Sequence, residues 1–317
     1  MLSRVADNLF WMSRYLERAE HTARVLGVGL NQMLDQTGQL AAPRWARLLT
    51  ALAIPPGEEM GDPAVILREL VFNAENPASI VACIAMAREN ARQVREQISS
   101  EMWEQLNRLY LRVRKADFAS IWAGDPAEFL QEVKEGAHLF QGVTDATMSH
   151  GEGWHFIEVG RYLERAVATS SLLDVYFHAL LEPIPGEPPL EYNDWVSLLK
   201  CCTSFETYCK TYTADVQHRC VAEFLLLNAE SPRSVRFAAD RLQHGLNAIA
   251  QATGGRPGGR VERLAGRLRA SLDYAQVDEI MNESLHSYLE SVQRQCGAIH
   301  MAIYQTYISY PVDTVLS

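Results

Sequence analysis

The sequence predicts an all-helical protein that consists of two related antiparallel helical bundles packed together. Near the N-terminus, apolar residues recur in alternating steps of four and three, which is the pattern of one helix face. A six-residue segment of this helix occurs a second time in the chain, letter for letter. The sequence contains no set of alternating β-branched runs bounded by turn residues, so we do not expect a sheet of any size.

The first expected helix has two distinct faces. One side is a hydrophobic seam, and on the opposite side aromatic rings lie beside basic side chains. Such rings next to arginines mark a contact or a cleft more often than a solvated surface, so we expect the helix to be covered on both sides. The seam consists of Val5, Leu9, Met12, Leu16, Ala19, Ala23 and Leu26, and the other face of Phe10, Trp11, Arg14, Arg18 and His21.

Two ordered repeats indicate an internal duplication. The sequence Arg-Tyr-Leu-Glu-Arg-Ala at residues 14–19 recurs at residues 161–166. A second element, Asn-Ala-Glu-x-Pro-x-Ser, follows each copy at nearly the same distance, at residues 73–79 and 228–234. The repeating unit is far longer than that of a solenoid. We therefore predict a first helical half over residues 1–145 and a second over residues 146–317, either as two units or as one continuous domain.

The second repeated element predicts helix starts. Asn76 and Ser231 are the expected N-caps, with Pro77 and Pro232 as first helical residues, because proline is tolerated in the first turn. In the first half the helix that follows carries an apolar seam as far as Ile98. Ser99, Ser100 and Glu101 then resemble the capped start of another helix. Segments rich in proline or glycine predict loops at residues 54–57, 183–189 and 254–259.

Composition limits the function classes. The chain has 317 residues, 48% of them hydrophobic, and a formal net charge of −10, which argues against a general nucleic-acid surface. Its six scattered cysteines are typical of a reducing compartment rather than a disulfide framework. The N-terminus lacks the apolar core of a signal peptide, and no stretch approaches the roughly 18 apolar residues of a membrane span. We therefore expect a cytoplasmic protein that binds neither nucleic acid nor membrane.

These motifs together resemble the Alpha-E family, a bacterial helical domain named for its Glu-Arg motif. The resemblance rests on the paired Tyr-x-Glu-Arg helices, the Asn-x-Glu-x-Pro-x-Ser junctions and residues 88–103, and it covers nearly the whole chain. It implies no established reaction. Members of the family resemble components of gene neighbourhoods that encode a circularly permuted ATP-grasp ligase, a transglutaminase-like peptidase and sometimes a proteasome-like hydrolase. The resemblance thus implies peptide synthesis or tagging, with the ATP-grasp ligase and the transglutaminase-like protein as partners.

The two Glu-Arg segments are the first candidate site. Glu17 can reach Arg14 within its helix, and Glu164 can reach Arg161. Around a pseudo-twofold axis these groups could form an ion-pair network that locks the halves together. Alternatively they line a pocket for an anion or substrate, in which Glu17 or Glu164 acts as catalytic acid or base. The binding residues of such a pocket would be Arg14, Tyr15, Arg18, Arg161, Tyr162 and Arg165.

A second candidate site is an arginine stripe in the first half. Arg88, Arg92 and Arg95 share one polar helix face and have no charged counterparts in the second half. They form either a solvated face paired with Glu89 and Glu96, or an anion site.

The junction elements supply the remaining candidates. Asn73, Glu75, Asn228 and Glu230 are explained by turn and capping geometry, or else they direct polar groups toward the motif helices.

Other chemistry finds no support in the spacing of residues. The cysteines and histidines match no zinc pattern, and the glycine-rich segment lacks the Lys-Ser/Thr ending of a phosphate-binding loop. We therefore predict no metal and no cofactor. Three functions remain: a helical partner of an ATP-grasp peptide ligase, an enzyme acting on a peptide or aminoacyl substrate in an Arg/Glu-lined cleft, and a structural dimerisation module. A dimerisation module would make the protein a homo-oligomer, and the sequence leaves the oligomeric state open.

Overall fold

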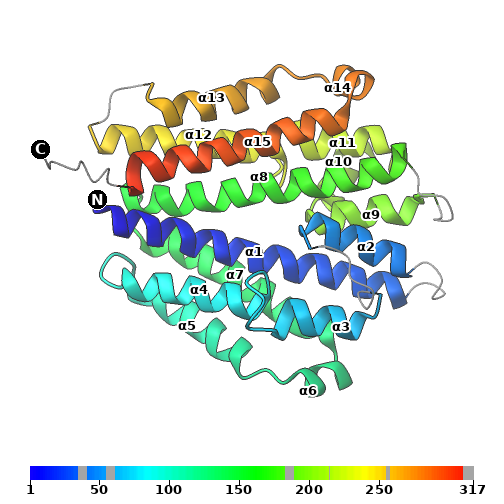
Figure 1. The fold of residues 1–317 in the computed structure, drawn as a ribbon, viewed down its shortest axis with the longest axis horizontal. Helices are drawn as coiled ribbons and strands as arrows, with labels where there is room; N and C mark the ends of the chain where they lie inside the picture. Colours follow the sequence, from blue (N-terminus) through cyan, green and yellow to red (C-terminus); the bar gives the residue numbers. More distant parts are fainter. Residues whose placement is uncertain (35–40, 55–60, 183–188, 214, 255–257, 310–317) are drawn as a thin grey trace, which may run out of the picture.

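The computed structural model describes residues 1–34, 41–54, 61–182, 189–213, 215–254 and 258–309. These residues form helices and no strand, which confirms the predicted all-helical class. Figure 1 shows the long helices running roughly along the long axis of the molecule and stacked in layers across it. The helices are α1 (Ser3–Leu34), α2 (Ala41–Ala51), α3 (Pro63–Leu67), α4 (Ile80–Gln93), α5 (Ser100–Arg114), α6 (Phe118–Ala123), α7 (Pro126–Thr147), α8 (Glu152–Leu181), α9 (Tyr192–Cys201), α10 (Phe205–Tyr212), α11 (His218–Leu227), α12 (Val235–Ala252), α13 (Arg260–Asp273), α14 (Val277–Glu283) and α15 (Leu285–Ile303), with π-helical turns η2 (Arg68–Phe72) and η3 (Tyr304–Ile308).

Helices α1 and α8 pack side by side in the middle of the molecule (Figure 1). Helix α1 packs against α4 and α7, and α5 contacts both of these. Helix α8 packs against α12 and α15, and α13 contacts both of these. Two of the short helices connect the two groups, since α2 contacts α8 and α9 contacts α1. Each long central helix is therefore surrounded on several sides.

The burial of α1 confirms the expectation that both of its faces are covered. On the seam, every predicted residue after Val5 is buried, and Val5 itself is half-buried. On the opposite face, Phe10 and His21 are also buried, and Trp11 is half-buried. The arginines of this face, Arg14 and Arg18, are half-buried.

All six cysteines are free, as expected for scattered small apolar residues. Cys83, Cys201, Cys202 and Cys296 are buried. Within the described ranges, none of the helices combines the length and the apolar character that crossing a membrane requires.

Both repeated junctions are turns, and the predicted N-caps at Asn76 and Ser231 are wrong. The caps are Ser79, whose hydroxyl accepts a hydrogen bond from the backbone N of Ala82 at 3.2 Å, and Ser234, which caps α12 in the same way. Asn76 instead accepts a hydrogen bond from the backbone N of Ala78 at 3.0 Å, and this bond closes the turn before the helix. The helices therefore begin three residues after the prolines.

The next helix start is confirmed. The Ser99 hydroxyl accepts a hydrogen bond from the backbone N of Met102 at 3.1 Å, and Glu101 lies in the first turn of α5. Helix α4 is shorter than its apolar seam suggested, because it ends at Gln93. Ile98 remains buried although it lies outside the helix.

The predicted division of the chain at residue 145 falls within the last turn of α7, which ends at Thr147. Helix α8 begins at Glu152, so the connection between the two groups of helices lies at residues 148–151. Of the predicted loops, residues 55–57, 183–188 and 255–257 lie outside the described part of the chain.

Gly160 allows the backbones of α1 and α8 to approach each other closely. A Cβ atom at this position would lie 2.5 Å from the carbonyl oxygen of Phe10 in α1. Because that neighbour is backbone within a long helix, it cannot move aside at small cost. Gly142 of α7 is the opposite case, since it is exposed and a Cβ there would meet no atom within 4 Å.

We therefore expect Gly160→Ala and Gly142→Ala to have opposite effects on stability. Gly160→Ala should lower the free energy of unfolding by about 1–3 kcal/mol through overpacking. Gly142→Ala should raise it by about 0.5–1 kcal/mol, because alanine is the better helix former. Urea unfolding of both variants measures the difference. Equal stability of Gly160→Ala and the wild type would contradict the close approach.

Candidate functional site

The two Glu-Arg segments meet across the interface between α1 and α8. Glu17 of α1 accepts two hydrogen bonds from Arg165 of α8, from Nε at 2.8 Å and from Nη2 at 2.9 Å. In the reverse direction, Arg18 Nε donates to Glu164 Oε1 at 2.6 Å, and Arg14 Nε donates to Glu164 Oε2 at 2.7 Å. Each glutamate is therefore held by arginines of the facing helix.

The expected pairs within each helix are consequently not the pairs that form. Arg161 donates to Glu158 at 2.6 Å rather than to a glutamate of the repeated segment. Arg241 of α12 joins the same carboxylate at 3.2 Å. In α1, Trp11 stands three residues before Arg14, as Glu158 stands before Arg161, and the Arg14 guanidinium lies 5.0 Å from the Trp11 ring centroid. The two copies of the motif thus have different surroundings.

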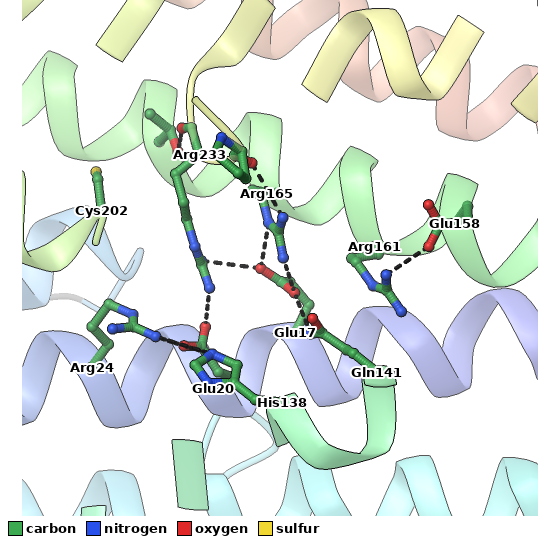
Figure 2. A network of polar contacts seen from close by, with 12 residues as sticks. Glu17, Glu20, Arg24, His138, Gln141, Glu158, Arg161, Arg165, Cys202 and Arg233 are labelled. Carbon is green, nitrogen blue, oxygen red and sulfur yellow. Dashed lines mark hydrogen bonds and ion pairs between the residues drawn. The ribbon is translucent and has the colours of Figure 1, made fainter. Parts of the chain in front are cut away.

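A further carboxylate, Glu20, extends the network by one helical turn. Arg233 joins both carboxylates of α1, since its Nη1 lies 3.0 Å from Glu17 Oε1 and its Nη2 bonds Glu20. Glu20 also pairs with Arg24, and His138 Nε2 lies 3.3 Å from Glu20 Oε1. Figure 2 shows Arg165 and Arg233 extending toward the carboxylates on α1 from the side of α8 and α12.

Burial and ion pairing have opposite effects on the pKa values of these carboxylates. Burial would raise the pKa of Glu17, but the guanidinium groups of Arg165 and Arg233 outweigh it and lower the pKa to about 2. The pKa of Glu20 is likewise well below its usual value despite burial, because of Arg233, His138 and Arg24. Arg14 and Arg18 lower the pKa of Glu164. All three carboxylates are therefore ionised at neutral pH.

The two motif tyrosines pack on arginines of the same network. The Arg18 guanidinium lies 5.7 Å from the ring centroid of Tyr15, and that of Arg165 lies 5.2 Å from the ring of Tyr162. At these distances the ring faces attract the cations and help to orient them.

A cavity of about 330 Å³ opens beside Glu164. Arg14, Arg18 and Thr22 of α1 line one side of it, together with His21. Residues 51–54, at the end of α2, and Ala78 close other sides. From α8 the wall consists of Glu164, Val167, Ala168 and Ser171. The sequence-predicted residues Arg14, Arg18 and Glu164 thus border open space, whereas Glu17 and Arg165 are enclosed in the network.

The junction residues form turns. Asn73 Oδ1 accepts a hydrogen bond from the backbone N of Glu75 at 3.0 Å, and Asn228 Oδ1 accepts one from the backbone N of Glu230 at 2.8 Å. The side chains of Glu75 and Glu230 are exposed. These contacts are those of turn geometry.

The arginine stripe is partly held by aromatic rings of α5. The Arg88 guanidinium lies 5.3 Å from the ring centroid of Trp103 and 4.6 Å from that of Tyr110. Arg95 lies 5.7 Å from the Trp103 ring, and Arg114 lies 5.9 Å from the Tyr110 ring. We call Arg95, Trp103, Arg88, Tyr110 and Arg114 the arginine–aromatic ladder.

Arg92, the remaining member of the stripe, is paired as the solvated interpretation expects. It donates two hydrogen bonds to Glu89, at 2.7 and 2.8 Å, on an exposed face. As for metal sites, His, Cys, Asp and Glu nowhere gather in threes that could hold an ion, as far as the described residues extend.

Comparison with known proteins assigns the chain to a family. The family model that matches residues 1–308 is described as Alpha-E, a predicted alpha-helical domain with a conserved ER motif. The chain belongs to the Alpha-E family. The two Glu-Arg pairs of this Alpha-E chain, 17–18 and 164–165, are the residues that connect α1 with α8.

The curated relatives that the chain resembles are uncharacterised proteins, so they do not indicate an activity. An uncharacterised protein of Mycobacterium bovis is 26% identical over 312 residues, which cover 90% of this chain and 34% of that protein. Uncharacterised proteins of Mycobacterium tuberculosis strains CDC 1551 and H37Rv are 26% and 25% identical with the same coverage. This Alpha-E chain therefore spans about a third of the length of these curated relatives. No solved structure matches it.

Sequence reasoning missed several network residues. Glu20 and Arg24 lie four residues apart on α1, which is the spacing of a helical ion pair and could have drawn attention to them. Arg233 also carried a signal, because it occupies a variable position of the second junction where the first has Ala78. His138 carried none, since it reaches Glu20 from α7, far away in the sequence.

We expect Glu17→Gln to destabilise the fold strongly. The substitution would leave the guanidinium groups of Arg165 and Arg233 buried beside a neutral amide, and breaking a buried pair in this way costs about 3–5 kcal/mol. Glu104→Gln is a matched control, because Glu104 is exposed on α5 and makes no ion pair within the described residues. Urea unfolding at pH 7 tests both variants. Equal midpoints for the two would show that the pairing contributes little.

His21 should make stability depend on pH. Burial, and next the charge of Arg233, lower the pKa of His21 from 6.5 to about 4. The unfolded chain therefore binds a proton that the folded protein excludes between these values. The contribution of His21 to the free energy of unfolding is therefore fully present above pH 6.5, and it decreases as the pH falls toward 4.

The expected loss over this range is about 2–3 kcal/mol. Burial also lowers the pKa of His155 and of His300, so the measurement compares urea unfolding of the wild type and His21→Asn at pH 7 and pH 4.5. The difference in stability between the two proteins should change with pH. A constant difference would contradict an uncharged, buried His21.

Proposed function

We propose that this chain is a non-catalytic helical partner of an ATP-grasp peptide ligase and acts in peptide synthesis or tagging. The family resemblance supports a place in such a system, with a transglutaminase-like protein as a further partner. The observation that carries the proposal is the arginine–aromatic ladder, which offers a fixed docking face.

The composition of the ladder fits a protein contact. Arginine, tryptophan and tyrosine dominate the energetics of protein interfaces, because they combine large area with directed hydrogen bonds. Arg88 is held between two rings, so less side-chain entropy is lost when it binds a partner. Met86 and Leu111, on the same two helices, are 46% and 40% exposed. We infer that the ladder receives an acidic surface with apolar neighbours.

A catalytic function is less well supported. An enzyme acting on a peptide or aminoacyl substrate would use Glu17 or Glu164 to carry a proton. Both carboxylates are held ionised by arginines, and a pKa of about 2 makes Glu17 a weak base at neutral pH. A structural dimerisation module is the other alternative, and the mass of the protein in solution would test it.

We also propose that the chain arose by internal duplication into two related bundles. The two repeated sequence elements support this. The helix contacts support it as well, because α1, α4, α5 and α7 contact one another in the same cyclic order as α8, α12, α13 and α15. In this correspondence α2 is the counterpart of α9, and each contacts the central helix of the other half.

Co-expression with the ATP-grasp ligase of the same genome tests the partner function. The wild type should co-purify with the ligase and raise its turnover. Arg88→Glu with Arg95→Glu should weaken the complex at least about tenfold, by reversing charge at the ladder. Arg294→Glu, a charge reversal at an exposed arginine of α15, should leave the complex intact. If the wild type neither co-purified with the ligase nor raised its turnover, the proposal would be contradicted.

A further inference from the structure

The cavity beside Glu164 contains unused hydrogen-bonding groups. Arg18 donates to Glu164 through Nε, while its two terminal nitrogens make no hydrogen bond to any described residue. The Arg18 side chain is 33% exposed and lines the cavity. Nε2 of His21 is buried and likewise has no partner in the described structure. Thr22 and Ser171 also line this cavity.

Charge in the network is unbalanced. Arg14, Arg18, Arg24, Arg165 and Arg233 are joined by ion pairs to only three carboxylates, Glu17, Glu20 and Glu164. The cavity wall itself holds two arginines and one glutamate, and His21 is neutral at pH 7 because its pKa is lowered. The wall therefore carries one net positive charge. A ligand with a single negative charge would compensate it.

The rest of the wall is apolar. Residues 51–54 run along one side with the sequence Ala-Leu-Ala-Ile, and Ala78, Val167 and Ala168 complete it. A cavity of about 330 Å³ is at the lower end of the range for small-molecule sites. It suits a compound of dipeptide size with small apolar groups.

Comparison of the two halves explains why the space is open. In the duplication proposed above, Ala78 corresponds to Arg233, and Val167 corresponds to Glu20. Beside Glu17, the ion pair between Arg233 of the second half and Glu20 of the first occupies the space. Beside Glu164, the corresponding residues are the small apolar Ala78 and Val167, and the cavity occupies the equivalent place. The corresponding arginines also differ, since Arg165 donates to Glu17 through two nitrogens and to the carbonyl oxygen of Pro232 through the third, whereas Arg18 donates to Glu164 through Nε.

We propose that this cavity binds the free carboxylate of a short apolar peptide, with Arg18 as the principal ligand and Arg14, His21 and Thr22 beside it. The carboxylate accepts hydrogen bonds from the terminal nitrogens of Arg18, and the small side chains contact residues 51–54. Arg14 keeps Glu164 ionised and in place, since both its Nε and Nη2 lie 2.7 Å from Glu164 Oε2. The inference rests on the proposed function, because it names the peptide end that the partner of a ligase would hold.

Isothermal titration of the isolated protein with N-acetyl-Ala-Ala tests the site. The matched probe is the same dipeptide with a C-terminal amide, which has the same shape and no charge. We expect saturable binding of the acid and at least about tenfold weaker binding of the amide, because charge-assisted hydrogen bonds are the stronger ones. Free alanine distinguishes a peptide site from a general amino-acid site, and it should bind at least about tenfold more weakly because it leaves the apolar wall uncovered.

Two variants locate the binding. Arg18→Gln removes the free donors, and Ala78→Leu fills the cavity without changing charge. Each should weaken binding of the acid at least about tenfold, while circular dichroism confirms folding. Arg92→Gln, which removes an exposed arginine away from the cavity, should bind as the wild type does.

Three results would overturn the inference: no binding of the acid by the wild type, equal binding of acid and amide, or unchanged binding by Ala78→Leu. Stronger or equal binding of free alanine would overturn the assignment to peptides. None of these results depends on the ligase, so the partner function could fail or hold independently in the co-expression experiment.

Discussion

The reciprocal pairing of glutamates and arginines between α1 and α8 is the interaction on which the rest of the structure depends. Glu17 is held by Arg165, and Glu164 by Arg18 and Arg14, so each helix satisfies the buried charge of the other. A buried ion pair contributes little net stability compared with apolar packing, but an unpaired buried charge is very unfavourable. The pairing therefore acts mainly on specificity. A shift of one helix by a turn would leave several charges without partners.

The same constraint explains the difference between the two sides of the interface. Where α1 carries Glu20, buried arginines accompany it, and space near Glu17 is filled by side chains. Where α8 has Val167, this position adds no carboxylate that a further arginine must pair, and the neighbouring junction carries alanine. One half of the interface is thus closed and structural, and the other is open. A single network accounts for both because both sides share the central pairs.

The sequence allowed prediction of the fold class, the seam of α1 and the importance of the Glu-Arg segments, since these follow from local periodicity and repetition. It did not allow prediction of the pairing across helices, because spacing along a chain reveals neighbours within one helix only. The sequence does not distinguish the true caps, Ser79 and Ser234, from Asn76 and Ser231, because a proline that follows a cap residue also fits the first turn of a helix. The cavity escaped sequence analysis altogether, as it depends on how α2, α8 and the junction meet around Arg18.

The division of roles between Arg14 and Arg18 determines whether an anion can enter without opening the interface. If Glu164 depended on Arg18 alone, a ligand that attracted this guanidinium would leave the glutamate buried and unpaired. Arg14 removes that conflict, because it contacts Glu164 through two nitrogens and is itself only 11% exposed. Arg18 keeps one bond to Glu164 and presents its other donors to the cavity. A bound anion would therefore add to the network, and it should stabilise the folded chain in proportion to its affinity.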